Sequence, residues 1–389
     1  MTCVVVGAGL TGLSAAWELT RAGTAVVVLE SERRTGGVVL TERRDGFLVE
    51  GGPDGFLAAD GDIPALAGEL GLGDRLVDQA ARGSMVWTGR RLEPIAEGRA
   101  AELLGIQLPT DVGAVPTDVG VVPTEVGVVP TDVGAQHAAP LRQGFRSFAG
   151  GMAELTEALA ARVGPIIRTA QGVTGIAPTA RGWRLAVTGG ASLEADGVVL
   201  ALPAWSAARL LAAVGVARAR ELDDVVYAPS VTASLAYRRD QLNGRLEGSG
   251  FVRAAETHGA VRACTYAWLK YPARAPSGYA LLRAFLEPAD GDPASLAHGE
   301  LATVLGLSGT PLWSRVFHWH RGLPRYKPGQ AERVAHVREQ LGCLAPLDVA
   351  GAGFDGAGVS ACVRSGREAA RRVLERVGAK TAGGSPFPG

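Results

Sequence analysis

Two glycine-rich motifs of the form G-x-G-x-x-G stand at opposite ends of the 389-residue sequence. The first, residues 7–12, follows the apolar run 3–6, and the second, residues 351–356, follows the strand-like run 347–350. Glycines at this spacing allow a tight turn and let phosphate groups approach backbone N–H groups at the positive N-terminus of a helix. Both motifs are therefore candidate ligand-binding loops, but their surroundings differ.

The first motif has the context that a dinucleotide site requires. A helical pattern covers residues 13–21, and a second strand, residues 25–29, is followed by Glu30. A carboxylate at this point can accept hydrogen bonds from an adenosine ribose and would repel a 2′-phosphate. This strand–helix–strand unit predicts a site for FAD or NAD rather than NADP.

The second motif lacks that context, because a single helix, residues 359–377, follows it with no further strand or acidic residue. A strand, a glycine turn and a helix N-terminus suit the pyrimidine end of a flavin ring, which gains negative charge on reduction. A glycine-rich turn without a ligand is the alternative. The two motifs together favour a flavin.

Further segments resemble a known family. Residues 30–37 resemble the E-x₃-R-x-G-G segment of the flavin amine oxidase superfamily, and residues 47–56 resemble its G-F-x-x-E-x-G-P segment. Within that superfamily the chain is similar to the oxygen-dependent porphyrinogen oxidases of haem synthesis. The segments that carry this similarity are 145–152, 268–272, 274–276, 324–329 and 356–366. The resemblance covers about residues 1–100 and 143–377.

The resemblance implies FAD, held without a covalent bond because no family-type cysteine anchor stands near the C-terminal helix. The motifs and the matched family positions give the following candidate cofactor-binding residues: Gly7, Ala8, Gly9, Leu10, Thr11, Gly12, Glu30, Ser31, Arg34, Gly37, Val38, Gly52, Pro53, Asp54, Gly55, Val173, Trp319, Gly351, Gly358 and Val359. For Val38, Val173 and Trp319, packing in the core is an equally good interpretation.

Candidate substrate residues also come from the resemblance. Val252 and Phe285 match family positions that line the tetrapyrrole pocket, and Arg82, Arg253 and Arg283 are candidate partners for propionate groups. No catalytic side chain is assigned, because the flavin itself accepts the hydride.

Histidine and cysteine patterns give no metal site. His318 and His320 share a strand face without an evident third ligand, and the four cysteines form no C-x-x-C pair. The 39 basic and 39 acidic side chains balance, and no basic tract indicates nucleic acid. No apolar stretch reaches 18 residues and no signal peptide precedes residue 3, so we expect a cytoplasmic protein with at most peripheral membrane contact.

The expected fold is α/β: a Rossmann-like FAD-binding domain with a discontinuous, mixed α+β substrate domain. The FAD-binding domain is assigned to residues 1–82, 143–206 and 337–378, and the substrate domain to residues 83–108 and 207–336. Helical patterns are predicted at residues 63–70 and 74–79, and a hairpin at 85–94. Residues 109–142 are assigned to an acidic linker and residues 379–389 to a disordered tail.

The linker contains an unusual repeat. Pro109, Pro116, Pro123 and Pro130 each open a Pro-Thr-Asp/Glu-Val-Gly unit. Proline and glycine at this frequency exclude a long helix, and an extended linker is favoured over a short stack of turns forming an edge ribbon. The family normally carries a longer helical insert here, which walls the substrate cavity and contacts the membrane. Its absence implies weak or no membrane contact.

These patterns support an FAD-dependent oxidase that dehydrogenates a porphyrinogen, either protoporphyrinogen IX or coproporphyrinogen III. The expected electron acceptor is O₂ or a quinone, and the expected partner is a small tetrapyrrole substrate. Two alternatives stay open: another oxidase or desaturase of the superfamily that acts on an amine or a polyene, and an inactive FAD-binding remnant.

Deletion of residues 110–123 should leave flavin binding and the melting temperature nearly unchanged. The repeat offers little apolar surface, and loop-closure entropy changes by only about 0.6 kcal/mol per doubling of loop length. Calorimetry and flavin absorbance of the deletion variant measure both quantities. A large loss of stability, or firm sedimentation of the intact protein with liposomes, would contradict the linker assignment.

Overall fold

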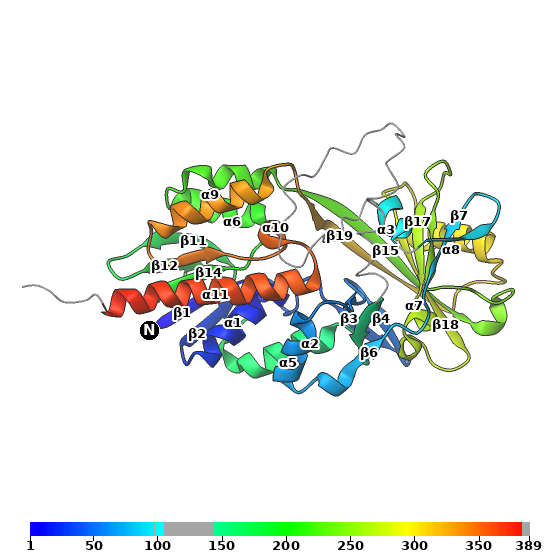
Figure 1. Cartoon of the computed structure of the whole chain (residues 1–389), viewed down its shortest axis with the longest axis horizontal. Helices are drawn as coiled ribbons and strands as arrows, with labels where there is room; N and C mark the ends of the chain where they lie inside the picture. The colour runs from blue at the N-terminus through cyan, green and yellow to red at the C-terminus, as the bar shows by residue number, and fades with distance from the viewer. Residues whose placement is uncertain (97, 105–143, 383–389) are drawn as a thin grey trace, which may run out of the picture.

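The computed structural model describes residues 1–96, 98–104 and 144–382. Two sheets lie side by side, with a parallel α/β unit on the left of Figure 1 and a mixed sheet on the right. This arrangement confirms the predicted fold class. The predicted linker, including its proline repeat, lies almost entirely outside the described residues, so its conformation stays a prediction, as do the domain limits.

The parallel sheet has five strands, and its order places the N-terminal strand at the centre. In spatial order they are β10 (Ile167–Arg168), β2 (Ala25–Leu29), β1 (Thr2–Val6), β14 (Gly197–Leu200) and β20 (Leu347–Val349). The central strands are apolar on both faces because helices cover both. One face carries α1 (Leu10–Arg21), α5 (Ala153–Val163) and α11 (Val359–Ala382), and the other carries α6 (Ala204–Ala213) and α9 (Gln330–Gly342).

The first and last helices of the unit are in close contact. Figure 1 shows the red α11 beside the blue α1. At their crossing a Cβ on Gly366 would stand 2.1 Å from the backbone oxygen of Thr11, so only glycine allows this approach. Arg367 forms ion pairs with Glu18 of α1 and Glu69 of α2 (Asp62–Leu70), both at 2.9 Å. The C-terminal helix is thus an integral part of the first core.

A three-stranded antiparallel sheet extends the second face of this unit. Its strands are β11 (Val173–Pro178), β12 (Trp183–Val187) and β13 (Ser192–Ala195). Trp183 is fully buried, and its indole donates a hydrogen bond to the carbonyl oxygen of Pro346 at 3.0 Å. This contact ties the sheet to the strand that leads into the second glycine motif.

The mixed sheet has seven strands and one parallel pair, β16 with β7. Its order is β19 (Trp313–Arg325), β15 (Val226–Arg238), β18 (Tyr279–Leu286), β17 (Val261–Tyr266), β16 (Gly250–Arg253), β7 (Ser84–Trp87) and β8 (Leu92–Ile95). Helix α8 (Pro293–Leu305) packs on one face. The hairpin β3 (Thr41–Arg44) and β4 (Phe47–Glu50) packs on the other, where Phe47 and Val49 contact Leu281 and Phe317.

One sequence expectation is wrong in detail. Residues 74–79, predicted as helical, form a short turn and strand β6 (Leu76–Asp78), which pairs with β9 (Phe145–Phe148). Pairing with a distant strand outweighs the local pattern here. Helix α11 continues through Ala382, three residues past the expected start of the tail, and the rest of the tail lies outside the described residues. The predicted hairpin at 85–94 is confirmed by the pairing of β7 with β8.

A buried ion pair connects the two units. Arg274, between α7 (Ala267–Lys270) and β18, places Nη2 3.0 Å from Oε1 of Glu50 at the end of β4. Thr41 Oγ1 donates to the other carboxylate oxygen at 2.6 Å, and the Met152 N–H donates to Oε1 at 3.0 Å. Arg274 also donates to the backbone oxygen of Phe148 at 3.1 Å. The Glu50 carboxylate is therefore well supplied with hydrogen bonds, whereas Nε of Arg274 is buried without a partner among the described residues.

Replacing Arg274 by Met should lower the free energy of unfolding by about 3–5 kcal/mol near neutral pH, because the Glu50 charge would stay buried without its partner. Burial already raises the pKa of Glu50 above its ordinary value, and loss of Arg274 raises it further. The folded variant then binds a proton more tightly than the unfolded chain does. Its stability should therefore fall as the pH rises through the acid range towards neutrality. Urea unfolding at several pH values measures this.

The matched control is the double variant Glu50→Gln, Arg274→Met, in which no buried charge is left. Its stability should exceed that of the single variant and should lack this pH dependence. A single variant whose stability does not change with pH would contradict the assignment.

Candidate functional site

The first glycine motif forms the turn between β1 and α1, and its three glycines have different environments. A Cβ on Gly12 would lie 1.9 Å from the Gly7 carbonyl oxygen, and a Cβ on Gly7 would lie 2.4 Å from that of Ala201. A Cβ on Gly9 would meet only the Cα of Gly37, at 3.8 Å. Chain packing therefore requires glycine at 7 and 12, whereas position 9 faces open space at the N-terminus of α1. Ala8, Leu10 and Thr11 are buried, so their side chains face inward.

Glu30 follows β2 at the same edge of the sheet. Its Oε2 accepts a hydrogen bond from the Ala8 N–H at 2.6 Å. Its Oε1 accepts from the Glu32 N–H at 2.9 Å and from the Ser31 hydroxyl at 3.2 Å. The carboxylate therefore lies directly beside the glycine turn, where the sequence analysis expects the ribose.

The segment after Glu30 folds back onto this turn. The Gly36 N–H donates to the Ala8 carbonyl at 2.8 Å, and Gly36 forms a bridge with Gly9. Arg34 donates to the carbonyl of Gly37 at 2.5 Å. Val38 stays 45% exposed next to these polar groups. An aliphatic side chain left uncovered beside an open backbone cradle is what a planar, partly apolar ligand would cover.

The loop after β4 carries the predicted residues from Gly52 to Gly55. A Cβ on Gly52 would lie 1.8 Å from the Val38 carbonyl oxygen, which fixes this loop against the preceding segment, and Pro53 follows directly. Asp54 is ion-paired with Lys270 at 2.9 Å. Burial alone would raise the pKa of Asp54, but Lys270 and then Arg283 bring it below its ordinary value. The Asp54 side chain therefore serves the contact between units. Its carbonyl oxygen accepts a hydrogen bond from the Ser147 hydroxyl at 2.8 Å, so only its backbone N–H is left for a cofactor.

The second glycine motif lies next to the first. A Cβ on Gly351 would stand 3.6 Å from Oγ1 of Thr11, although the two residues are far apart in sequence. Gly351 has φ 122° and Gly356 has φ 117°, values that side chains rarely allow. The loop ends at Gly358, and Val359 opens α11. Both predicted loops therefore meet at the carboxyl edge of the parallel sheet, as ligand sites in such sheets do.

Sequence reasoning missed the groups that hold the second loop in place. The Gly351 N–H donates to Oγ of Ser365 at 2.8 Å, and that hydroxyl donates to Asp355 at 2.5 Å. Asp355 forms a bidentate pair with Arg338, at 2.8 and 2.7 Å. The one available signal was an acidic residue inside the glycine motif itself. Gly36, whose φ is 97°, was also missed although it belongs to a glycine pair.

Two predicted cofactor residues come from outside these loops. Trp319 of β19 donates its indole N–H to the Gly51 carbonyl at 2.7 Å, which joins the mixed sheet to the loop after β4. Val173 begins β11, and a Cβ on the preceding Gly172 would stand 3.2 Å from the Ser31 side chain. Val173 is therefore near the end of β2 where Glu30 lies. Both side chains also pack on neighbouring apolar clusters.

The two predicted substrate residues lie on one face of the mixed sheet. Val252 and Phe285 both pair with Ala263, so they flank it on adjacent strands. The row of paired residues across the strands continues from Phe285 through Thr232 to Phe317. The Phe317 ring lies close to Gly51, because a Cβ added to Gly51 would stand about 3 Å from it. This apolar face therefore turns towards the loop after β4. Val252 is buried and Phe285 is half-buried.

The three arginines that are candidate partners for propionate groups have different surroundings. Arg253 is occupied by the carbonyls of Val261 and Thr257 and by the carboxylate of Glu287. Arg283 is buried, with its guanidinium 4.9 Å from the centre of the Phe285 ring. Arg82 lies at the edge of the mixed sheet, outside this row. Within residues 1–96, 98–104 and 144–382 no group of histidine, cysteine or carboxylate side chains could hold a metal.

Comparison with known proteins identifies relatives over nearly the whole chain. The family model described as flavin containing amine oxidoreductase matches residues 10–123 and 131–374. The chain is 24% identical to the coproporphyrinogen III oxidase of Bacillus subtilis, over 95% of this chain and 97% of that protein. It is 27% identical to the same-named protein of Propionibacterium freudenreichii, over 97% and 92%. The Bacillus alignment spans 461 residues, more than the 389 of this chain, so the relative has segments that this chain lacks.

Solved structures share the fold. A protein from Exiguobacterium sp. 255-15, provisionally named protoporphyrinogen oxidase, superposes with a TM-score of 0.76 at 23% identity, over 96% of this chain and 99% of that one. Cyclohexylamine oxidase from Brevibacterium oxydans gives a TM-score of 0.72 at 15% identity, over 97% and 99%. Among the residues that the structure describes, no helix is long and apolar enough to span a membrane.

Replacing Gly9 by Val should lower the FAD content of the purified protein at least about tenfold with little change in the melting temperature of the apoprotein, because the new side chain fills ligand space rather than protein space. Gly12→Ala is the matched comparison. It should damage folding itself, because its Cβ would overlap the Gly7 carbonyl. Flavin absorbance and calorimetry distinguish the two effects. A Gly9→Val protein that keeps its yellow cofactor would disprove this placement.

Proposed function

Because the chain belongs to the flavin containing amine oxidoreductase family, we propose that it is an FAD-dependent porphyrinogen oxidase of haem biosynthesis. The near-full-length similarity to proteins named coproporphyrinogen III oxidase carries this proposal. The reaction would convert a porphyrinogen into the porphyrin with O₂ as acceptor. The names of these relatives favour coproporphyrinogen III as substrate, with protoporphyrinogen IX as the second candidate.

The residues at the two glycine motifs are suited to bind FAD. Open space at Gly9 gives the pyrophosphate access to the N-terminus of α1, and Glu30 lies where the adenosine ribose would bind. The second glycine loop places the N-terminus of α11 beside the first, which suits the electron-rich end of the flavin ring. FAD, when bound, would accept hydride equivalents from the substrate and pass them to O₂.

The chain's own part in the reaction would be to position the ring and exclude water. Val252, Ala263 and Phe285 offer an apolar surface opposite the loop that follows β4. Trp319 holds that loop through the Gly51 carbonyl, so the surface and the cofactor cradle keep a fixed separation. The row itself contains no titratable group, but the buried guanidinium of Arg283 lies 4.9 Å from the centre of the Phe285 ring on the same face. The ring would therefore be held by apolar contact with one cationic group beside it.

O₂ or a quinone is proposed as acceptor rather than NAD(P). Among the described residues, one strand–helix–strand unit joins a glycine motif to a carboxylate in register, namely β1, α1 and β2 with Glu30. The proposal also includes a cytoplasmic location with weak or no membrane contact. Rapid oxidation of added NADPH by the purified protein would contradict the choice of acceptor.

The FAD-saturated protein should convert coproporphyrinogen III or protoporphyrinogen IX into the fluorescent porphyrin while consuming O₂. Porphyrin fluorescence and an oxygen electrode measure the two sides of the reaction, and the Gly9→Val variant corrects for spontaneous oxidation. A yellow protein that oxidises neither porphyrinogen faster than this control would refute the proposal. Oxidation of amines or polyenes by that protein would then indicate another activity of the family, and none at all would indicate an inactive flavoprotein.

A further inference from the structure

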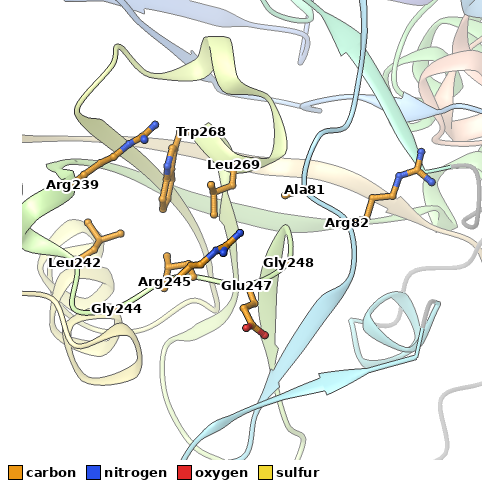
Figure 2. A pocket seen from close by; sticks show the side chains of 11 residues that line it. Ala81, Arg82, Arg239, Leu242, Gly244, Arg245, Glu247, Gly248, Trp268 and Leu269 are labelled. Atoms are coloured by element: carbon orange, nitrogen blue, oxygen red, sulfur yellow. The ribbon is translucent and has the colours of Figure 1, made fainter.

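A pocket of about 620 Å³ opens at the edge of the mixed sheet, away from the glycine loops (Figure 2). It is bounded by the segment before β7, by the loop between residues 242 and 248, and by α7. Of the residues assigned from sequence, Arg82 lines it, as a candidate partner for a propionate group, and no assigned cofactor residue does. Its size lies in the range of roughly 300–1,000 Å³ that is usual for small-molecule sites.

One wall of the pocket is apolar. It consists of Leu242, Leu246, Leu269 and the ring of Trp268. The Trp268 side chain is only 5% exposed, and its indole N–H donates to no acceptor among the described residues. Its nitrogen is not one of the buried side-chain atoms that lack a partner, so solvent reaches this donor. The wall therefore combines a flat apolar surface with a donor that a ligand could use in place of water.

The charged groups of the pocket are mainly cationic. Arg82, Arg239 and Arg245 line it, with Glu247 as the opposing charge. Arg239 donates Nε to the Tyr279 carbonyl at 3.1 Å. Arg245 donates to no acceptor within the described part of the chain, and Figure 2 shows its guanidinium directed across the pocket towards Leu269 and Gly248. A guanidinium in this position suits a carboxylate, which it can bind with two parallel hydrogen bonds.

We propose that this pocket binds an organic carboxylate with a broad apolar body, at a site separate from the flavin. An inorganic anion would leave the leucine and tryptophan wall uncovered, and an uncharged apolar molecule would leave Arg245 without a partner. The proposal rests on the proposed function for the identity of the ligand: the porphyrin product is such a carboxylate. The pocket would then hold the product after it leaves the flavin.

The ordinary alternative is that these arginines are solvated surface side chains, since isolated surface charges usually contribute little. One observation counts against it. The Arg245 side chain, although exposed, is directed across the pocket over an apolar wall rather than out into solvent or towards a carboxylate. A solvated arginine does not require this direction.

The experiment is a titration of the FAD-saturated protein with coproporphyrin III, which is already oxidised and is not turned over. Calorimetry should give two binding sites in the wild type and one in Arg245→Glu, or at least about a tenfold weaker second site. Arg181→Glu makes the same charge change at an exposed position between β11 and β12 and should bind as the wild type does. Arg245→Gln repeats the test without adding a negative charge, and melting temperatures verify that each variant is folded.

Two further probes define the ligand. Laurate, a carboxylate without a planar ring, should compete weakly, and inorganic phosphate should not compete. If laurate competes as strongly as the porphyrin does, the ligand class is fatty carboxylates rather than tetrapyrroles. That result would overturn the assignment of the porphyrin product to this pocket. Equal porphyrin binding by the wild type and both Arg245 variants would overturn the pocket itself.

The outcome is independent of the test of the proposed function. If porphyrinogen is oxidised but Arg245→Glu changes neither stoichiometry nor affinity, the function stands and this inference fails. If no porphyrinogen is oxidised but binding still depends on Arg245, the pocket stands and the proposed function fails.

Discussion

The contact on which the relation between the two sheets depends is the buried ion pair of Glu50 and Arg274. Their side chains are 4% and 1% exposed, so both charges are withdrawn from water. Such a pair contributes little net stability, since desolvation offsets most of the attraction, but it tolerates very little displacement. Glu50 directly precedes the loop that Trp319 holds, and Arg274 reaches back to Phe148. The pair thereby fixes the cofactor cradle relative to the apolar sheet face.

The glycines of the candidate cofactor site are of two kinds. Gly7, Gly12 and Gly52 are glycine because neighbouring backbone oxygens leave no room for a side chain. Gly9 has room on the protein side and is open towards the ligand. The sequence motif alone does not distinguish these glycine positions from one another. Only the packing around each one separates those that shape the loop from the one that leaves space for a bound molecule.

The sequence was most informative where structure is local. The first strand–helix–strand unit with Glu30 at its end, the short hairpin of β7 and β8, and the helix after the second glycine motif follow from periodicity and turn chemistry over a few residues. Residues 74–79 were mispredicted because their partner β9 lies far along the chain. The Ser365–Asp355–Arg338 chain was invisible for the same reason, since hydrogen bonds between distant residues leave no periodic trace.

The close approach of α1 and α11 has a consequence for how the protein is made. Thr11 and Gly366, which packs on it, are 355 residues apart in the sequence. At roughly 5–20 residues per second, a ribosome needs about 20–70 s to make the segment between them. Throughout that time α1 has α2 and α5 beside it at most, and lacks the cover that α11 gives it in the folded protein. The glycine turn therefore reaches its final packing only after α11 has been made.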